Sequence, residues 1–278
     1  MSYMAELKLK LKAPPQTPVE GEVLTPDNLA GRSLNEILNL ETWRGNRRVK
    51  LSELFTVEGE SASKPSDLHI IIEGDLRKVR HLGARMSAGK ITVNGSVGTF
   101  VGFEMTGGTI VVNGDADAFV GMGMSGGVIE VNGNAGDAVG SGYWGTRCGM
   151  KGGLILVKGN VGTALGCWMK GGTIRVGGNA DVFTGVRMQG GTIFVAGNVG
   201  AKLGAAMVDG KIVVLGNVPN ILPSFHIDEI RPNTKVDGDK IEGPFYVFHG
   251  DITEDGNGKL FISVEKNPHL KHREAYIF

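Results

Sequence analysis

Apolar positions recur along the middle of this chain with a fixed spacing. A strand-like segment of the form Ile-x-Val begins at Ile91 and returns at Ile110, a step of 110 − 91 = 19 residues. The same segment starts again at Ile129, Ile155, Ile174, Ile193 and Ile212. Every step is 19 residues except one, where 155 − 129 = 26. A period near 20 residues predicts a solenoid whose repeats stack around one core.

Glycine occupies three fixed positions in the repeat. The first column reads Gly95, Gly114, Gly133, Gly159, Gly178, Gly197 and Gly216. The second reads Gly102, Gly121, Gly140, Gly166, Gly185 and Gly204, and the third reads Gly89, Gly108, Gly127, Gly153, Gly172, Gly191 and Gly210. Glycine accepts positive φ and lets backbones approach closely, so these columns predict three corners in each coil.

Methionine fills a further column, which is expected to form a ladder in the core. Its members are Met86, Met105, Met124, Met150, Met169, Met188 and Met207, seven of the ten methionines in the chain. An unbranched thioether fills irregular apolar gaps, so the column is interpreted as core, and a metal-handling role is disfavoured.

Asparagine follows the first glycine in five successive coils, at Asn134, Asn160, Asn179, Asn198 and Asn217. Identical polar residues stacked in register form hydrogen-bonded ladders. This column is therefore expected to satisfy backbone groups at a turn, and a catalytic role for it is disfavoured.

The expected fold is all-β, a right-handed parallel β-helix with about eight coils of 19-residue period. Both residues of each Ile-x-Val pair share one face of a strand because side chains alternate. Neighbouring coils should lie about 4.8 Å apart, as strands in a sheet do. The apolar columns are spaced 2, 4, 4 and 4 residues apart and lack a hexapeptide subperiod, which favours the right-handed form.

The repeat divides the chain into three segments. Residues 1–66 do not repeat and are expected to be an N-terminal cap of strands and one short helix. Residues 67–218 form the glycine-rich β-helix, and residues 219–278 form an irregular C-terminal segment in which prolines break the period. That segment is expected to contain a β-hairpin built from Phe245–Asp251 and Lys259–Val264.

Three elements are expected in the cap. Alternation of Leu and Lys predicts a surface strand over residues 6–12. Ser33 and Glu36 have the spacing of a capping box and predict a short helix over residues 34–40. A further short strand is expected over residues 49–57.

Composition narrows the class of protein. Glycine makes up 45 of 278 residues, and because this excess is periodic it indicates a solenoid and not disorder. Lys plus Arg and Asp plus Glu are both 29, so a net charge of zero favours neither nucleic acid nor an anionic membrane. No apolar run approaches the length of a membrane span, and residues 1–12 lack a signal-peptide core, so a cytoplasmic location is expected.

The two cysteines, Cys148 and Cys167, each precede a column methionine by two residues. They should therefore stack on neighbouring coils, within disulfide range. A cytosolic setting would keep both thiols reduced.

The long repeat carries an insertion at Ser141–Gly149. It contains Tyr143, Trp144 and Arg147, and Trp168 follows on the next coil. These residue types are enriched at the centres of interfaces, and insertions in solenoids loop out on one face. We expect these four side chains to form a partner interface, with a ligand site and plain local packing as alternatives.

Candidate chemistry is otherwise sparse. A basic run is interpreted as a solvated or partner-facing rim, with an anionic-ligand site as the alternative: Arg77, Lys78, Arg80, His81 and Arg85. No P-loop, nucleophile elbow or His-Glu-x-x-His motif occurs. No catalytic, cofactor-binding or metal-ligating residue is therefore expected on this chain.

The repeat Ile-x-Val-x-Gly-(Asn/Asp)-(Val/Ala), with the later glycine and methionine columns, resembles the glycine-rich β-helix of two protein groups. One is the C-terminal domain of the large subunit of glutamate synthase. The other is the C subunit of formylmethanofuran dehydrogenase, with its bacterial relative in the formyltransferase/hydrolase complex. The resemblance covers about Leu68–Asn217. The blocks Gly140–Tyr143 and Gly149–Gly153 look like the insertion of the C subunit, and no amidotransferase or flavin-binding portion occurs.

The resemblance implies a scaffold that carries no cofactor. In that family, the C subunit holds together the amidohydrolase-like A subunit and the B and D subunits. These other subunits carry tungsto- or molybdopterin, iron–sulfur clusters and a binuclear metal site. The archaeal complex reduces CO2 to formate and condenses it with methanofuran, the first step of methanogenesis from CO2. The bacterial relative hydrolyses the formyl carrier and releases formate.

The leading interpretation is therefore a non-catalytic scaffold, the C subunit of a tungsten- or molybdenum-dependent formylmethanofuran dehydrogenase. The C subunit of the bacterial complex and a stand-alone glutamate synthase-type domain are alternatives. A rival of another class is an enzyme that acts on polysaccharide or acyl substrates in a groove near Tyr143–Arg147.

Overall fold

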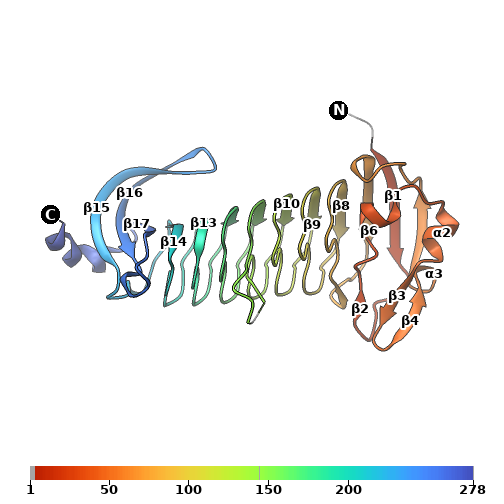
Figure 1. The fold of residues 1–278 in the computed structure, drawn as a ribbon, viewed down its shortest axis with the longest axis horizontal. Helices are drawn as coiled ribbons and strands as arrows, with labels where there is room; N and C mark the ends of the chain where they lie inside the picture. Colours follow the sequence, from red (N-terminus) through yellow and green to blue (C-terminus); the bar gives the residue numbers. More distant parts are fainter. Residues whose placement is uncertain (1–3, 144, 278) are drawn as a thin grey trace.

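The computed structural model describes residues 4–143 and 145–277. The protein is mostly β, and 13 strands form one long sheet in which parallel pairs dominate (Figure 1). The middle of this sheet contains one strand from each repeat: β8 (Lys90–Asn94), β9 (Thr109–Val112), β10 (Val128–Val131), β11 (Leu154–Val157), β12 (Thr173–Val176), β13 (Gln189–Val195) and β14 (Asp209–Val214). No helix in the described residues is long and apolar enough to cross a membrane.

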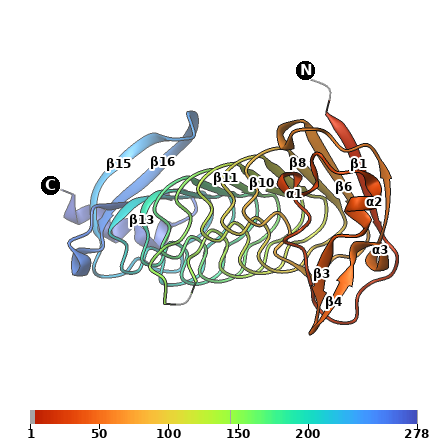
Figure 2. The same ribbon diagram turned by 45° about the vertical axis from the view of Figure 1, so that its right-hand side comes forward.

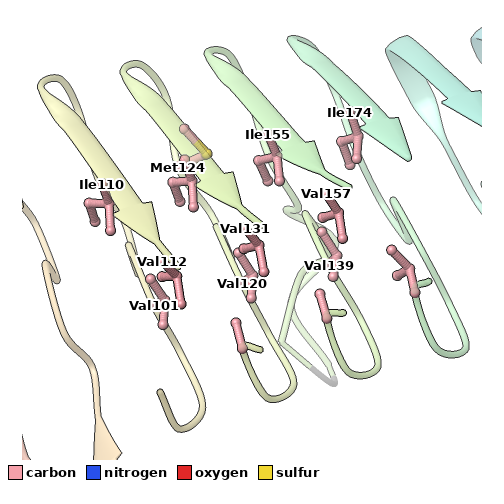
Figure 3. Close-up of a cluster of buried hydrophobic side chains, with 14 of the residues drawn as sticks. Val101, Ile110, Val112, Val120, Met124, Val131, Val139, Ile155, Val157 and Ile174 are labelled. Carbon is pink, nitrogen blue, oxygen red and sulfur yellow. The ribbon is translucent and has the colours of Figure 1, made fainter. Parts of the chain in front are cut away.

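The strands pair in a register of one repeat. Ile110 of β9 lies opposite Ile91 of β8 on one side and Ile129 of β10 on the other. Both apolar residues of each Ile-x-Val segment are buried, as in Ile110 and Val112, while the residue between them faces outward. The inward side chains form continuous columns along successive turns (Figure 3).

Two further backbone ladders hold the turns together. Parallel bridges connect one small apolar residue of each turn to the next: Leu76, Val97, Ala116, Ala135, Val161, Ala180 and Val199. On another side, the second-column glycines donate to carbonyls one turn earlier, as Gly121 does to Val101 at 2.8 Å. Each turn is therefore bonded to its neighbours along three segments, and Figure 2 shows the turns lying side by side.

The glycine columns serve two different purposes. All members of the second and third columns have positive φ, with values from 64° to 104°. In the first column, all of it within the described residues, only Gly95 does, so the expected positive-φ corner at Gly178 is wrong. A Cβ on Gly178 would instead lie 2.5 Å from Asn160 Oδ1 and 2.7 Å from the Gly159 oxygen. Close approach of consecutive turns is therefore what demands glycine there.

The methionine column lies inside the turns. All seven of its side chains have no exposed surface: Met86, Met105, Met124, Met150, Met169, Met188 and Met207. A Cβ added at Gly172 or Gly191 would lie within 2.8 Å of the terminal methyl of Met150 or Met169. The third glycine column thus makes room for the methionine ends.

Asparagine side chains form a hydrogen-bonded ladder along one corner. Each side-chain oxygen accepts the backbone N–H of the next asparagine, as Asn134 Oδ1 does from Asn160 at 2.9 Å. At the first end Asp115 replaces asparagine and accepts from Asn134 at 2.7 Å. At the last end Asn267 Oδ1 accepts from Val218 at 2.7 Å, so a residue of the C-terminal segment completes the ladder.

The N-terminal segment covers the first turn. Strand β1 (Ala5–Leu11) pairs in parallel with β6 (Leu68–Glu73), and β5 (Phe55–Gly59) pairs antiparallel with β1 at the sheet edge. A second, four-stranded sheet contains β4 (Arg47–Lys50), β3 (Glu41–Arg44), β2 (Val19–Glu20) and β7 (Val79–Arg80). The short helices are α1 (Pro26–Leu29), α2 (Leu34–Leu38), α3 (Leu51–Leu54) and the 3-10 turn η1 (Pro65–Asp67).

The capping box before α2 is present, since Ser33 and Glu36 each accept from the other's backbone N–H. The continuous strand expected over residues 49–57 is wrong, because α3 interrupts it. Glu53 accepts the backbone N–H of Lys50 at 3.0 Å, which starts this helix, and Leu51 is buried. Burial of two leucines on one side of a single turn decides the local structure here.

The C-terminal segment closes the other end and adds an arm. Strand β17 (Gly258–Ser263) pairs in parallel with β14 and antiparallel with β16 (Asp239–Gly250), as the expected hairpin requires. The sequence did not predict β15 (His226–Val236), which pairs with β16 and extends the hairpin into the arm seen in Figure 1. The remaining elements are the 3-10 segments η2 (Ile252–Glu254) and η3 (Pro268–Tyr276).

The arm lies over the outer face of the last strands. Val236, Phe245 and Val247 of the arm pack with Val213 and Phe261 in a second buried apolar cluster. The tip reaches back to β12, where Asp239 pairs with Arg175 at 2.7 Å and Asp237 accepts from Thr173 at 2.6 Å. The arm therefore covers the outer face of the sheet at this end.

Candidate partner-binding surface

An outward ladder of aromatic rings runs along one corner of the turns. Its residues stand two positions before the second-column glycines and have positive φ: His81, Phe100, Phe119, Ala138, Ala164, Phe183 and Lys202. His81 stacks on Phe100 with ring centroids 4.7 Å apart, and Phe100 stacks on Phe119 at 4.8 Å. Lys202 Nζ lies 4.8 Å from the ring centroid of Phe183.

The ladder is interrupted where two turns carry alanine. Ala138 and Ala164 leave a gap between the rings of Phe119 and Phe183, and a cavity of about 240 Å³ lies there. Tyr143 of the insertion also lines this cavity. The cavity is mostly apolar. Ala138 and Ala164 line it, and Phe119 and Phe183 line it on either side of them.

The insertion is attached to the next turn at both of its ends. Gly142 donates to the Cys167 oxygen at 3.0 Å, and Gly149 donates to the Trp168 oxygen at 2.8 Å. Within the loop, the Thr146 N–H and hydroxyl both donate to the Tyr143 oxygen, at 2.8 and 2.9 Å. These bonds form a turn that presents Tyr143, whose exposed fraction is 54%. Trp144 lies outside the described residues.

Two arginines contact the ring of Trp168. The guanidinium carbons of Arg147 and Arg187 are 5.7 and 5.1 Å from its ring centroid. Three of the four residues expected at the interface, Tyr143, Arg147 and Trp168, thus lie around one loop. The arrangement offers an apolar hollow beside two cations, which suits an apolar segment that also carries carboxylates.

The two cysteines lie beside this surface, and both are free thiols. Cys167 lines the cavity. Burial raises the pKa of the Cys167 thiol, and the nearby charge of Arg187 opposes that effect.

Most basic side chains of the run Arg77–Arg85 form ion pairs with carboxylates. Hydrogen bonds from Arg77 lower the pKa of Asp75 to about 2. Arg80 pairs with Glu20, whose second oxygen lies 2.7 Å from His81 Nδ1. The run is therefore engaged with carboxylates, most clearly with the N-terminal segment, and leaves few cations for an anionic ligand.

One group of three potential metal ligands occurs in the described residues. Oxygens of Glu20 and Glu22 and a ring nitrogen of His81 lie within 4.8 Å of one another. Arg80 pairs with Glu20, and Arg85 lies 4.0 Å from Glu22, so cations of the protein already balance both carboxylates. This arrangement is that of an ion-pair network, which fastens β2 to the first turn.

Sequence reasoning missed the aromatic ladder and its gap. The signal was present, because Phe100 and Phe119 are 119 − 100 = 19 residues apart and Phe183 falls in the same column. The column contains His, Phe, Ala and Lys, so its members share no chemical type. Their common property is an outward position, which only the turn geometry reveals.

Comparisons with known proteins give partial sequence matches and an extensive structural one. No protein-family model matches the chain. It is 42% identical over 99 residues to the C subunit of the tungsten-containing formylmethanofuran dehydrogenase 2 of Methanothermobacter wolfeii, a match covering 36% of this chain and 37% of that protein. The C subunit of the molybdenum-containing formylmethanofuran dehydrogenase 1 of Methanosarcina barkeri is 41% identical over 98 residues, or 35% and 33% of the two chains.

The matched part thus spans about a third of the length of these curated relatives. The structural match is longer. A chain in the X-ray structure of the formyltransferase/hydrolase complex (FhcABCD) from Methylorubrum extorquens, in complex with methylofuran, superposes with a TM-score of 0.81. The match covers 92% of this chain and 99% of that one at 28% identity. The protein is therefore related to the C subunit of formylmethanofuran dehydrogenase and, in structure, to a chain of the FhcABCD complex.

Proposed function

We propose that this protein is a non-catalytic scaffold, the C subunit of a complex of the formylmethanofuran dehydrogenase and formyltransferase/hydrolase type. The observation that carries the proposal is the structural match over 92% of this chain to a chain of the FhcABCD complex. Coverage of this extent includes most of the two terminal segments as well as the stacked turns. A shared repeat alone would align only the stacked turns.

The stacked turns are proposed to be a right-handed parallel β-helix of about eight coils. Such a body suits a scaffold because each turn is bonded to its neighbours and the ends are closed. Strand β1 pairs beside β6 at one end, and β17 pairs beside β14 at the other. The edges of the terminal repeat strands are thereby covered, and β5 and β15 become the edge strands of the sheet.

The partners are proposed to be the amidohydrolase-like A subunit and the pterin-binding and iron–sulfur B and D subunits. Those subunits would carry the metals and cofactors, and the assembly would act in cytoplasmic one-carbon metabolism. This chain would add no catalytic group.

Two forms of the complex agree with this proposal. The C subunits of the tungsten and molybdenum enzymes are 42% and 41% identical to this chain over about a third of its length. The FhcABCD chain shares 28% identity over nearly all of it. The sequence matches favour a formylmethanofuran dehydrogenase, and the longer structural match favours the FhcABCD complex. A stand-alone glutamate synthase-type domain is the remaining alternative.

The loop around Tyr143 is the proposed contact with a partner protein of the complex. Tyr143 is exposed, two guanidinium groups lie over the Trp168 ring, and an apolar hollow lies beside them. The Ser141 hydroxyl at the base of the loop is buried without a hydrogen-bond partner among the described residues. A partner that enters the hollow would cover the apolar walls.

Co-expression with the products of the adjacent genes tests the proposal. A tag on this chain should co-purify an amidohydrolase-like protein and a pterin-binding protein in fixed ratio, with tungsten or molybdenum in the eluate. A chain that purifies alone under these conditions, or that turns over a carbohydrate or acyl substrate by itself, would contradict the scaffold function.

A further inference from the structure

A second cavity, of about 520 Å³, lies beneath the C-terminal arm. Its floor is formed by the first residues of β14 and β17, and its wall by Arg231–Lys235 of β15. Figures 1 and 2 both show the arm extending over this end of the sheet. The cavity is far along the sheet from the insertion loop and shares none of its residues.

Two lysines face each other on the floor of this cavity. Lys211 of β14 and Lys259 of β17 are register partners in a parallel pair. Their neighbours Ile212 and Leu260 are fully buried in the turns, so both lysines project to the outer face beneath the arm. In the described residues no ion pair joins either ammonium to a carboxylate, and Lys211 Nζ donates instead to the Lys235 oxygen at 2.6 Å.

The other charged groups of the cavity do not balance this pair. Arg231, Lys235 and Asp209 also line it, and Glu229 pairs with Arg231, so the lining together with this partner carries 4 − 2 = 2 net positive charges. The Asp209 carboxylate already accepts the Gly210 N–H at 2.7 Å. Glu229 neutralises Arg231 at 2.6 Å, outside the lining, and Asp237 attracts Lys211 from the arm tip without contact.

Like charges opposite one another across two strands destabilise a sheet. Here the arm adds to this cost by removing water from the floor. Burial lowers the pKa of Lys211, Asp237 opposes the shift, and the charge of Lys259 lowers the pKa further. The two ammonium groups therefore share a partly covered site in which positive charge exceeds negative charge.

We propose that this cavity is an oxyanion site, in which Lys211 and Lys259 bind one phosphate-sized anion between them. The ammonium groups would each donate to the anion, and the amide groups of Asn233 and Asn257, which also line the cavity, would add neutral donors. The anion is either free phosphate or the terminal phosphate of a small molecule. This site is independent of the scaffold function and of the Tyr143 loop.

Calorimetry with the full chain tests the site. Inorganic phosphate should bind and should raise the melting temperature relative to chloride at equal ionic strength, because the anion binds only the folded state. Lys259→Gln should weaken phosphate binding about tenfold or more, the loss of one charge-assisted bond. The same variant should melt higher than the unsubstituted protein in chloride, since the repulsion is gone.

Lys259→Arg should retain phosphate binding, because it keeps the charge and the donors. Lys240→Gln is the matched control, since Lys240 stands on the same arm, is exposed and pairs with Glu242 at 2.7 Å. Phenyl phosphate that binds more tightly than phosphate would indicate a terminal group of a larger molecule, and the reverse order would indicate the free ion. Equal phosphate binding by the unsubstituted protein and Lys259→Gln, or no binding by either, would overturn the proposal.

Discussion

The side-chain oxygen of Asn160 accepts the backbone N–H of Asn179, one turn further along, at 2.8 Å. Asn160 Oδ1 is also the atom nearest to the place a side chain would occupy at Gly178. One column of the repeat thus explains another, because the asparagine ladder fills the space that glycine leaves free.

Asn160→Ala should lower the free energy of unfolding by about 1–3 kcal/mol, because the Asn179 N–H loses its acceptor in a tight corner. Asn160→Asp should cost less, since aspartate already plays this role at Asp115, which accepts from Asn134. Urea unfolding of both variants gives the comparison. An alanine variant as stable as the aspartate variant would show that water replaces the lost bond.

Gly178→Val should destabilise by well over about 1 kcal/mol, because a side chain cannot fit between consecutive turns. Gly238→Ala is the control: it has positive φ of 86° in the arm turn, but no atom lies within 4 Å of its added Cβ. Its loss should be limited to the backbone term of about 1 kcal/mol. Similar melting temperatures for the two variants would count against close approach as the reason for glycine.

Met188→Asp should destabilise by more than the about 2–5 kcal/mol of a Met→Ala change, because the new carboxylate would be buried without a partner. Val208→Asp provides a control on the same turn, since Val208 is 41% exposed. Solubility and thermal unfolding of the two variants separate burial from a general effect of added charge. A soluble Met188→Asp protein with unchanged stability would refute the inward position of the column.

Tyr143→Ala combined with Trp144→Ala should leave the fold intact and weaken assembly with partner proteins by about 2 kcal/mol or more, as hot-spot truncation does. Tyr276→Ala removes another exposed tyrosine, 61% exposed, from the C-terminal end and should leave assembly unchanged. Co-purification at low protein concentration, with circular dichroism as the folding check, measures both. Full retention of every partner by the double variant would return the loop to local packing.

Alkaline pH should destabilise the C-terminal end through Tyr246. Burial and the hydrogen bond to Glu274, 2.8 Å long, raise the pKa of Tyr246 to about 12. Above pH ~10 the unfolded tyrosine loses its proton while the folded one keeps it, so stability falls as pH rises from ~10 towards 12. Tyr246→Phe should remove this part of the pH dependence. Absorbance titration that finds every tyrosine ionising near pH 10 in the folded protein would contradict it.

The stacked turns could be predicted from the sequence because every repeat places the same residue types at the same positions. Ile91 and Ile110 stand one 19-residue repeat apart, lie opposite each other in neighbouring strands and are both buried. An aligned column of such residues therefore predicts which side chains of every repeat point inward. The capping box at Ser33 was equally readable, since its partners lie three residues apart. A structure that depends only on residues within one repeat or one helical turn can be predicted without knowing which distant residues contact it.

Tertiary structure decided what depends on partners far along the chain. Strand β15 was missed because Pro232 argues against a strand, yet the proline lies where the register shifts between Arg231 and Asn233 and no ladder bond is needed. The arm is held by Val213 and Phe261, which periodicity alone leaves facing solvent. The cavity beside Tyr143 and the Lys211–Lys259 pair likewise arise only when turns and terminal strands are placed together. These features depend on contacts between residues that are far apart in the sequence, and the pattern of residues along the chain does not show such contacts.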